Sequence, residues 1–250
     1  MTCRLGADEL LVLWEHALGQ RAAVRDDALL KALDGPGLAP RRLGERNARL
    51  LGLHARCFGS ELVLLSHCPA CGSAAEFGSD CEALASQFLP SLAEPAPHRL
   101  EAHGHAIEFR LPEAADIDAA ALSTATAMDA TDDDAFAQAL LARCVVACTH
   151  DGAPVPTHAL PTALLDALSQ RMEALDPAAS VSFALECPAC ANPWSARLDV
   201  GQLLWQKLQA SAERVLLDVD ALARAYGWTE PEVLRLSPTR RAAYLQLAAA

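Results

Sequence analysis

The same four-residue turn, Cys-Pro-Ala-Cys, occurs twice in this sequence, at Cys68–Cys71 and at Cys187–Cys190. Two cysteines separated by two residues direct both sulfurs to one point, so each copy supplies half of a tetrahedral four-cysteine metal site. Short segments of apolar and small or polar residues flank both copies, and they predict a strand on each side of the turn. Such an element is a zinc knuckle, and two facing knuckles make a zinc ribbon. The sequence therefore predicts a structural Zn²⁺ bound by Cys68, Cys71, Cys187 and Cys190.

The two halves of this predicted site are separated by 115 residues. Closing a loop of roughly 100 residues costs about 4–5 kcal/mol of chain entropy. Structural zinc in small peptides contributes an apparent ~10–16 kcal/mol near pH 7. Zinc binding therefore outweighs loop closure, and the intervening residues are expected to fold as an insertion.

Other interpretations of the paired cysteines remain open. A redox CxxC site places its first cysteine at the start of a helix, whereas Cys71 is followed by Gly72, Ser73 and a short extended stretch. A pair of disulfides requires an oxidising compartment, and residues 1–9 contain no apolar signal segment. A third interpretation is a zinc ribbon that has lost its metal. His67, next to Cys68, is a weaker ligand candidate than the four thiols.

Composition and charge limit the classes of function. The chain has 250 residues, of which 52% are hydrophobic, and its apolar runs are far shorter than the ~20 residues of a membrane span. The formal net charge of −12 disfavours binding to nucleic acid or to anionic membranes. We expect a soluble, cytoplasmic protein that has no nucleic-acid or membrane partner.

The predicted fold class is α+β: mainly helical, with a split four-cysteine zinc ribbon, a small β-hairpin and a C-terminal helical hairpin. Residues 1–58 are predicted to form an N-terminal helical segment, and residues 59–78 and 180–199 the split ribbon. Residues 79–179 are predicted to form the insertion, and residues 200–250 the C-terminal helical segment.

Within the insertion, residues 99–111 read as a hairpin about Gly104, and helices are expected near 115–128, 132–148 and 160–174. On the predicted 132–148 helix, Cys144 and Cys148 are four residues apart, a spacing that can hold a metal ion. Their apolar neighbours favour two buried core thiols instead. His103 and His105 are expected to be solvated residues at the hairpin turn.

The C-terminal segment has the clearest helix signals. Asp199 is a predicted N-cap with Gln202 as its partner, and Gly227 is a natural C-terminal stop. Thr229–Glu232 is a second capping box, and Ser237 with Pro238 begins a further helix. One apolar stripe runs along the first helix: Leu204, Leu208, Val215, Val219, Leu222 and Tyr226.

No Ser/His/Asp set, phosphate-binding glycine loop or HExxH motif is present, so the sequence does not predict an enzyme. The stretch Tyr226–Arg241 resembles a helix-turn-helix in outline, with the pair Arg240 and Arg241 as basic residues. Between Glu213 and Leu247, however, five Arg are balanced by five Asp or Glu. A DNA-binding helix-turn-helix needs a net positive face. We therefore prefer the interpretation that this segment binds a protein partner.

Residues 216–230 and 234–245 resemble the C-terminal signature of the baseplate hub assembly chaperone family, which serves contractile-tailed phages and phage-tail-like injection systems. The paired CPxC turns, the stretch Glu45–Leu51 and Trp194 are similar to the longer members of that family. Two positions depart from its pattern: Asp220 stands where His is expected, and Ala191 where Gly is usual.

This resemblance implies a non-enzymatic cytoplasmic assembly factor for the baseplate, hub or spike of a contractile tail, one that need not remain in the finished particle. The implied partners are baseplate, hub or spike proteins. Candidate contact residues are Trp228, Leu234, Arg240, Arg241 and Tyr244. The alternatives are a zinc-ribbon transcription regulator that binds nucleic acid and a thiol-disulfide oxidoreductase.

Overall fold

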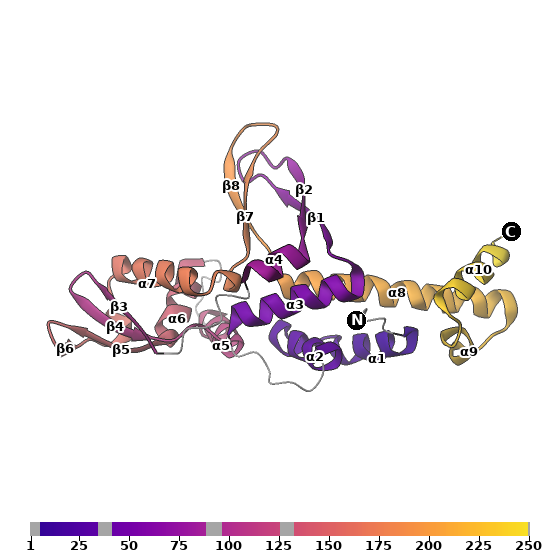
Figure 1. The fold of residues 1–250 in the computed structure, drawn as a ribbon, viewed down its shortest axis with the longest axis horizontal. Helices are drawn as coiled ribbons and strands as arrows, with labels where there is room; N and C mark the ends of the chain where they lie inside the picture. The colour runs from indigo at the N-terminus through magenta and orange to yellow at the C-terminus, as the bar shows by residue number, and fades with distance from the viewer. Residues whose placement is uncertain (1–5, 35–41, 89–96, 126–132, 250) are drawn as a thin grey trace. The chain divides into compact units, whose positions relative to one another are not determined.

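The computed structural model describes residues 6–34, 42–88, 97–125 and 133–249, and its elements divide into two compact units (Figure 1). The first unit comprises Met1–Ala39, Leu50–Glu61 and Asp199–Ala250. The second comprises Pro40–Arg49 and Leu62–Leu198. The predicted α+β class is confirmed, with small hairpin sheets among a majority of helical residues.

The first unit is helical, and its core lies between the long helix α8 and the two N-terminal helices. Both α1 and α2 pack against α8, and α9 and α10 pack against its C-terminal part (Figure 1). Fully buried leucines in this unit include Leu29, Leu204, Leu208 and Leu222. Its helices are α1 (Ala7–Ala17), α2 (Ala22–Asp34), the second half of α3 (Leu43–Phe58), α8 (Val200–Tyr226), α9 (Glu230–Leu234) and α10 (Pro238–Ala248).

The predicted caps set the ends of the C-terminal helices. The Asp199 side chain accepts a hydrogen bond of 2.8 Å from the Gln202 N–H at the start of α8. Gly227 ends the helix with φ at +70°, a left-handed conformation that glycine adopts without steric cost. Thr229 and Glu232 form the capping box of α9, and Ser237 caps α10. These three helices confirm the predicted C-terminal helical hairpin.

The second unit contains two separate two-stranded hairpins, a four-stranded antiparallel sheet and the helices that surround them. The hairpins are β1 (Glu61–His67) with β2 (Ala74–Asp80), and β7 (Ser182–Glu186) with β8 (Pro193–Arg197). The sheet has the order β3 (His98–Ala102), β4 (His105–Phe109), β5 (Val145–His150) and β6 (Ala153–Pro154). The helices are α4 (Cys81–Phe88), α5 (Ala114–Ala125), α6 (Asp133–Cys144) and α7 (Thr162–Leu175), with 3₁₀ turns η2 (Thr157–Ala159) and η3 (Pro177–Ala179).

The structure corrects the predicted 132–148 helix. Helix α6 ends at Cys144, and the next residues form β5, which pairs with β4 so that Cys148 lies opposite Ile107. Two consecutive β-branched residues, Val145 and Val146, favour a strand here over a helix. The predicted hairpin is therefore half of a larger sheet.

Cys144 and Cys148 are consequently not neighbours on one helix face. Both are buried in a core that β4 and β5 share with Leu164 and Leu168 of α7. Burial raises the pKa of Cys144 to about 11. Both cysteines act as small core residues, as their apolar neighbours indicate.

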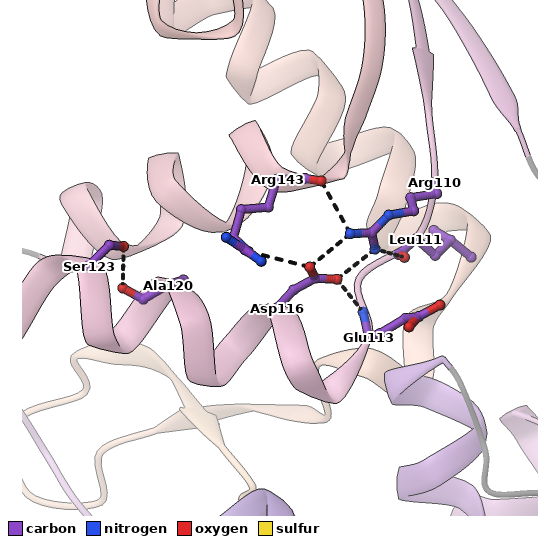
Figure 2. A network of polar contacts seen from close by, with 7 residues as sticks. All are labelled: Arg110, Leu111, Glu113, Asp116, Ala120, Ser123 and Arg143. Atoms are coloured by element: carbon purple, nitrogen blue, oxygen red, sulfur yellow. Dashed lines mark hydrogen bonds and ion pairs between the residues drawn. The ribbon is translucent and has the colours of Figure 1, made fainter.

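A polar network joins β4 to α5 and α6 (Figure 2). The Arg110 guanidinium donates two hydrogen bonds, of 2.6 and 2.8 Å, to the Asp116 carboxylate. Asp116 also accepts from the Glu113 N–H at 2.9 Å and forms an ion pair with Arg143. The hydrogen bonds from Arg110 are the main reason that the pKa of Asp116 lies below its usual value. This network connects the first turn of α5 and the last turn of α6 to the residue that follows β4.

A second polar contact joins the segments that lead into the two hairpins. At the start of α3, the Gly44 N–H donates to Asp176 Oδ2 at 3.0 Å, and Asn47 Nδ2 donates to the Ala178 carbonyl at 2.8 Å. Asp176 is only 2% exposed, and a Cβ atom at position 44 would overlap its carboxylate. The glycine therefore lets a buried carboxylate reach the N-terminal turn of a helix. We call these two hydrogen-bonded contacts the stem contacts.

Candidate metal centre

Each Cys-Pro-Ala-Cys turn is held by its own backbone. In the first, the Gly72 N–H donates to the Cys68 carbonyl at 2.8 Å, and the Cys68 N–H donates to the Ser73 carbonyl at 2.9 Å. The second repeats this pattern, with bonds from Ala191 to Cys187 at 2.9 Å and from Cys187 to Asn192 at 3.0 Å. The repeated sequence thus produces the same turn twice.

The residue after each second cysteine has a left-handed backbone. Gly72 has φ at +73° and Ala191 has φ at +54°. A residue with a Cβ atom has a steric cost in this region of roughly 1–2 kcal/mol. Ala191, which departs from the glycine that is usual at this position, therefore has a strained backbone.

The two hairpins pack face to face (Figure 1). The rings of Phe77 on β2 and Phe183 on β7 have centroids 5.2 Å apart in a tilted arrangement. On the neighbouring strands, Trp194 Nε1 donates a hydrogen bond of 3.3 Å to Ser66 Oγ. These contacts join the two hairpins through their strands as well as through their turns.

The four cysteine sulfurs meet at the tips of the hairpins. All four lie within 4.8 Å of one another, with Cys68 Sγ 3.7 Å from Cys190 Sγ and Cys71 Sγ 3.6 Å from Cys187 Sγ. A tetrahedral ion with metal–sulfur bonds of about 2.3 Å requires sulfur–sulfur separations of about 3.8 Å. The sulfurs are also much too far apart for disulfides, whose bond is about 2.05 Å. The geometry can therefore hold one metal ion.

Burial and proton affinity differ among these thiols. Cys68 and Cys187 are each 2% exposed, whereas Cys71 and Cys190 are exposed. Burial raises the pKa of Cys187, but hydrogen bonds from the N–H groups of Ala189 and Cys190 and from neighbouring thiols lower it to about 7. The Asn192 N–H lowers the pKa of Cys190, but hydrogen bonds with Cys71 and Cys187 outweigh it and raise the pKa to about 12. A bound cation would remove the repulsion among thiolates held this close together.

The donor set restricts which ions fit. Mg²⁺ and Ca²⁺ prefer oxygen ligands, whereas thiolates select softer cations. In the described part of the chain, these four cysteines are the one group of three or more metal-ligating side chains whose donor atoms come this close. His67 is exposed and does not belong to that group.

The remaining cysteines are separate from this cluster. Cys81 is fully buried, and burial raises its pKa to about 12. Cys57 is half-buried, and Cys3 lies outside the described residues. Neither Cys57 nor Cys81 belongs to the group of converging sulfurs at the paired turns.

The His103–Gly104 turn has a partner that the sequence does not predict. The ring of His105 stacks on that of His150, at 4.3 Å between centroids, because β4 and β5 place these residues opposite each other. The Nδ1 atom of His105 is hydrogen-bonded to the His103 carbonyl, and the Nδ1 atom of His150 is hydrogen-bonded to the Gly104 carbonyl. Because the sequence pattern favours a helix up to residue 148, it gives no sign of this pairing.

The predicted partner-contact residues lie at the end of the first unit. Trp228 and Tyr244 are half-buried, and their rings meet edge to face at 4.9 Å between centroids. Trp228 also stacks on Tyr226, which is 39% exposed. Leu234 is half-buried, and Arg240 is exposed.

Arg241 is placed differently from the other four residues. It is 9% exposed, and its Nε atom lies 3.0 Å from Asp218 Oδ2 on α8. A buried, ion-paired guanidinium fastens α10 to α8 and does not offer its charge to a partner. Its assignment as a direct contact is therefore not favoured by this geometry.

Comparisons with protein-family models, with curated proteins and with solved structures give no match to this chain. Among the described residues, no helix combines the length and the apolar character needed to cross a bilayer.

Proposed function

We propose that Cys68, Cys71, Cys187 and Cys190 bind a structural Zn²⁺. The observation that carries this proposal is the convergence of four sulfurs from two identical turns, with separations of 3.6 and 3.7 Å. Zinc–thiolate bonds of about 2.3 Å in a tetrahedron match these separations closely. Zinc also tolerates this geometry without a preference imposed by its d electrons.

The same donor set favours a structural role for the ion over a catalytic one. Catalytic zinc sites keep one coordination position for water or substrate, whereas four protein ligands leave none. The ion would hold together two hairpins whose turns are 115 residues apart in the chain. The stem contacts and the Phe77–Phe183 contact support the same arrangement from the protein side.

We further propose that the chain is a non-enzymatic assembly factor for the baseplate, hub or spike of a contractile tail. Its support is the resemblance of residues 216–230 and 234–245, together with the paired turns, to the hub assembly chaperones. The half-exposed aromatic residues Trp228 and Tyr244 offer a surface for a protein partner. The net charge of −12 favours a protein partner over nucleic acid.

The alternative function, a thiol-disulfide oxidoreductase, requires a different structure around the turns. A reactive CxxC thiolate is stabilised at the N-terminus of a helix. Here strands β2 and β8 come after the two turns instead. A thiol oxidoreductase would also have to work with four converging sulfurs where two suffice, so the structural metal is the simpler account.

Two experiments test these proposals separately. Elemental analysis of the purified full chain should find one zinc per chain, and replacement of Cys68 by Ser should abolish it; a metal-free chain that folds equally well would refute the zinc proposal. Co-expression with the baseplate, hub and spike proteins of a contractile tail encoded in the same genome should yield a complex. Failure of each of these proteins to co-purify would refute the assembly role.

A further inference from the structure

The C-terminal end of the first unit presents three aromatic rings that contact one another and remain partly open to water. The rings of Tyr226 and Trp228 stack at 4.9 Å between centroids, and Trp228 meets the edge of Tyr244 at the same separation. Tyr226 is 39% exposed, and the other two rings are half-buried. Stacked aromatic rings that remain open to water are enriched at sites of protein recognition.

Helix α10 extends this surface in a fixed direction. Arg240, Tyr244 and Leu247 are spaced by four and then three residues, so they lie on one face of the helix. Leu247 is 68% exposed, and Arg240 is also exposed. Arg241 lies about a quarter-turn around the helix from this face, buried against Asp218. The recognition surface is therefore defined by Tyr226, Trp228, Arg240, Tyr244 and Leu247.

The charge of this surface is opposite to that of the chain. The chain carries a net charge of −12, yet residues 226–249, which include the whole surface, contain three Arg against two Glu, a net charge of +1. Arg241 is neutralised by Asp218, whereas Arg240 has no ion-pair partner among the described residues. The nearest preceding acid, Glu232, accepts hydrogen bonds of 2.8 and 2.7 Å from Thr229. Within the described ranges, Arg240 is thus an exposed cation without an ion pair, beside an apolar surface.

We infer that this surface binds a protein segment in which aliphatic side chains lie next to a carboxylate. The aromatic rings and Leu247 supply apolar area for the aliphatic groups, and Arg240 supplies the charge that a carboxylate complements. Arg240 and Arg235, which is also exposed and acts on Glu232, are too few cations for a nucleic acid, whose binding depends on several phosphate contacts. This inference names the partner chemistry for the assembly factor proposed above, and in that sense it rests on the proposed function.

A displayed library of random 16-residue peptides, selected against the full chain, tests the inference. The selected peptides should combine Asp or Glu with aliphatic residues. Arg240→Glu and Leu247→Ser should each weaken their binding at least tenfold. Arg214→Glu is the matched control, because it makes the same charge change at an exposed position on α8, about 18 Å along the helix from Tyr226. Circular dichroism verifies that all three exposed-site variants remain folded.

Several outcomes would overturn the inference. These are a library without binders, selected peptides without acidic residues, and binding that Arg240→Glu leaves unchanged. A further arm uses single-stranded poly(U) RNA and a DNA duplex; binding that Arg240→Glu abolishes would assign the surface to phosphates instead. Selected acidic peptides in the absence of any complex with baseplate proteins would support the surface and refute the assembly role. A baseplate complex that Arg240→Glu leaves intact would support the assembly role and refute the proposed binding surface.

Discussion

The two Cys-Pro-Ala-Cys hairpins share one turn sequence, and they differ in the residues after the turn and in the strand that carries the phenylalanine. The first turn continues into Gly72 and Ser73, and the second into Ala191 and Asn192, yet both close with the same pair of backbone hydrogen bonds. The first hairpin contributes its phenylalanine from its second strand, and the second hairpin from its first strand. The turn geometry is therefore a local property of the four shared residues, whereas the way in which the hairpins pack together depends on residues that they do not share.

The largest expected effect comes from removing one sulfur from either hairpin. If the hairpins contribute equally to one zinc, Cys71→Ser and Cys190→Ser should both lose the metal. With it they should lose a large part of the roughly 10–16 kcal/mol that structural zinc contributes in small peptides. Elemental analysis of both variants measures the metal content, and denaturant unfolding measures the loss of unfolding free energy. A variant that keeps a full complement of zinc would show that the hairpins are not equivalent.

The second effect tests whether the stem contacts hold the hairpins independently of the metal. Gly44→Ala places a Cβ atom against the buried Asp176 carboxylate, which must move and give up its hydrogen bond from the Gly44 N–H. The expected loss, measured by denaturant unfolding, is about 2–3 kcal/mol of unfolding free energy. Zinc content should stay unchanged.

Gly52→Ala is the control for this substitution, because it lies on the same helix, α3. There the added Cβ atom would have an ordinary contact of 3.8 Å with Arg56. The helix should therefore gain up to about 1 kcal/mol, which is the difference in helix propensity between alanine and glycine. Equal losses from both substitutions would mean that the helix tolerates no alanine, and the stem contact would not be the cause.

The third prediction concerns the residue after each second cysteine, Gly72 in one turn and Ala191 in the other, where the two turns differ in backbone strain. Ala191→Gly should stabilise the chain and Gly72→Ala should destabilise it, each by about 1 kcal/mol, because both positions have a left-handed backbone. No atom lies within 4 Å of a Cβ atom added at Gly72, so the cost there is conformational and not steric crowding by neighbours. Thermal unfolding of the two variants in the presence of Zn²⁺ measures both changes in stability. Changes of the same sign would contradict the equivalence of the turns.

How far the sequence predicts this molecule depends on how local each signal is. The paired turns, the cap at Asp199 and the stop at Gly227 are all readable, because each is specified by residues within four positions of one another. The contact between Gly44 and Asp176 joins residues 132 apart, and nothing in either segment alone indicates it.

Strand β5 shows how tertiary context can override a local pattern. The run from 132 to 148 has helix-favouring residues up to Cys144, and a helix does form there. Beyond that point, pairing with β4 and burial of Cys148 against α7 stabilise a strand. The stacking of His105 on His150 cannot be predicted without this strand. The aromatic contact between Tyr226, Trp228 and Tyr244 likewise depends on α10 folding back on α8.

The smallest expected effect concerns the single polar contact between the facing hairpins. The Trp194 indole donates to Ser66 at 3.3 Å, and both side chains are half-buried. A double-mutant cycle of Trp194→Phe and Ser66→Ala should therefore give a coupling energy of only about 0.5 kcal/mol. The cycle separates the hydrogen bond from the apolar area that the indole also loses, which a single substitution cannot do. A coupling well above 1 kcal/mol would mean that the hairpins recognise each other through this polar pair, and that the metal joins halves already paired. A small coupling would leave the sulfur cluster, the Phe77–Phe183 contact and the stem contacts as the interactions that hold the two hairpins together.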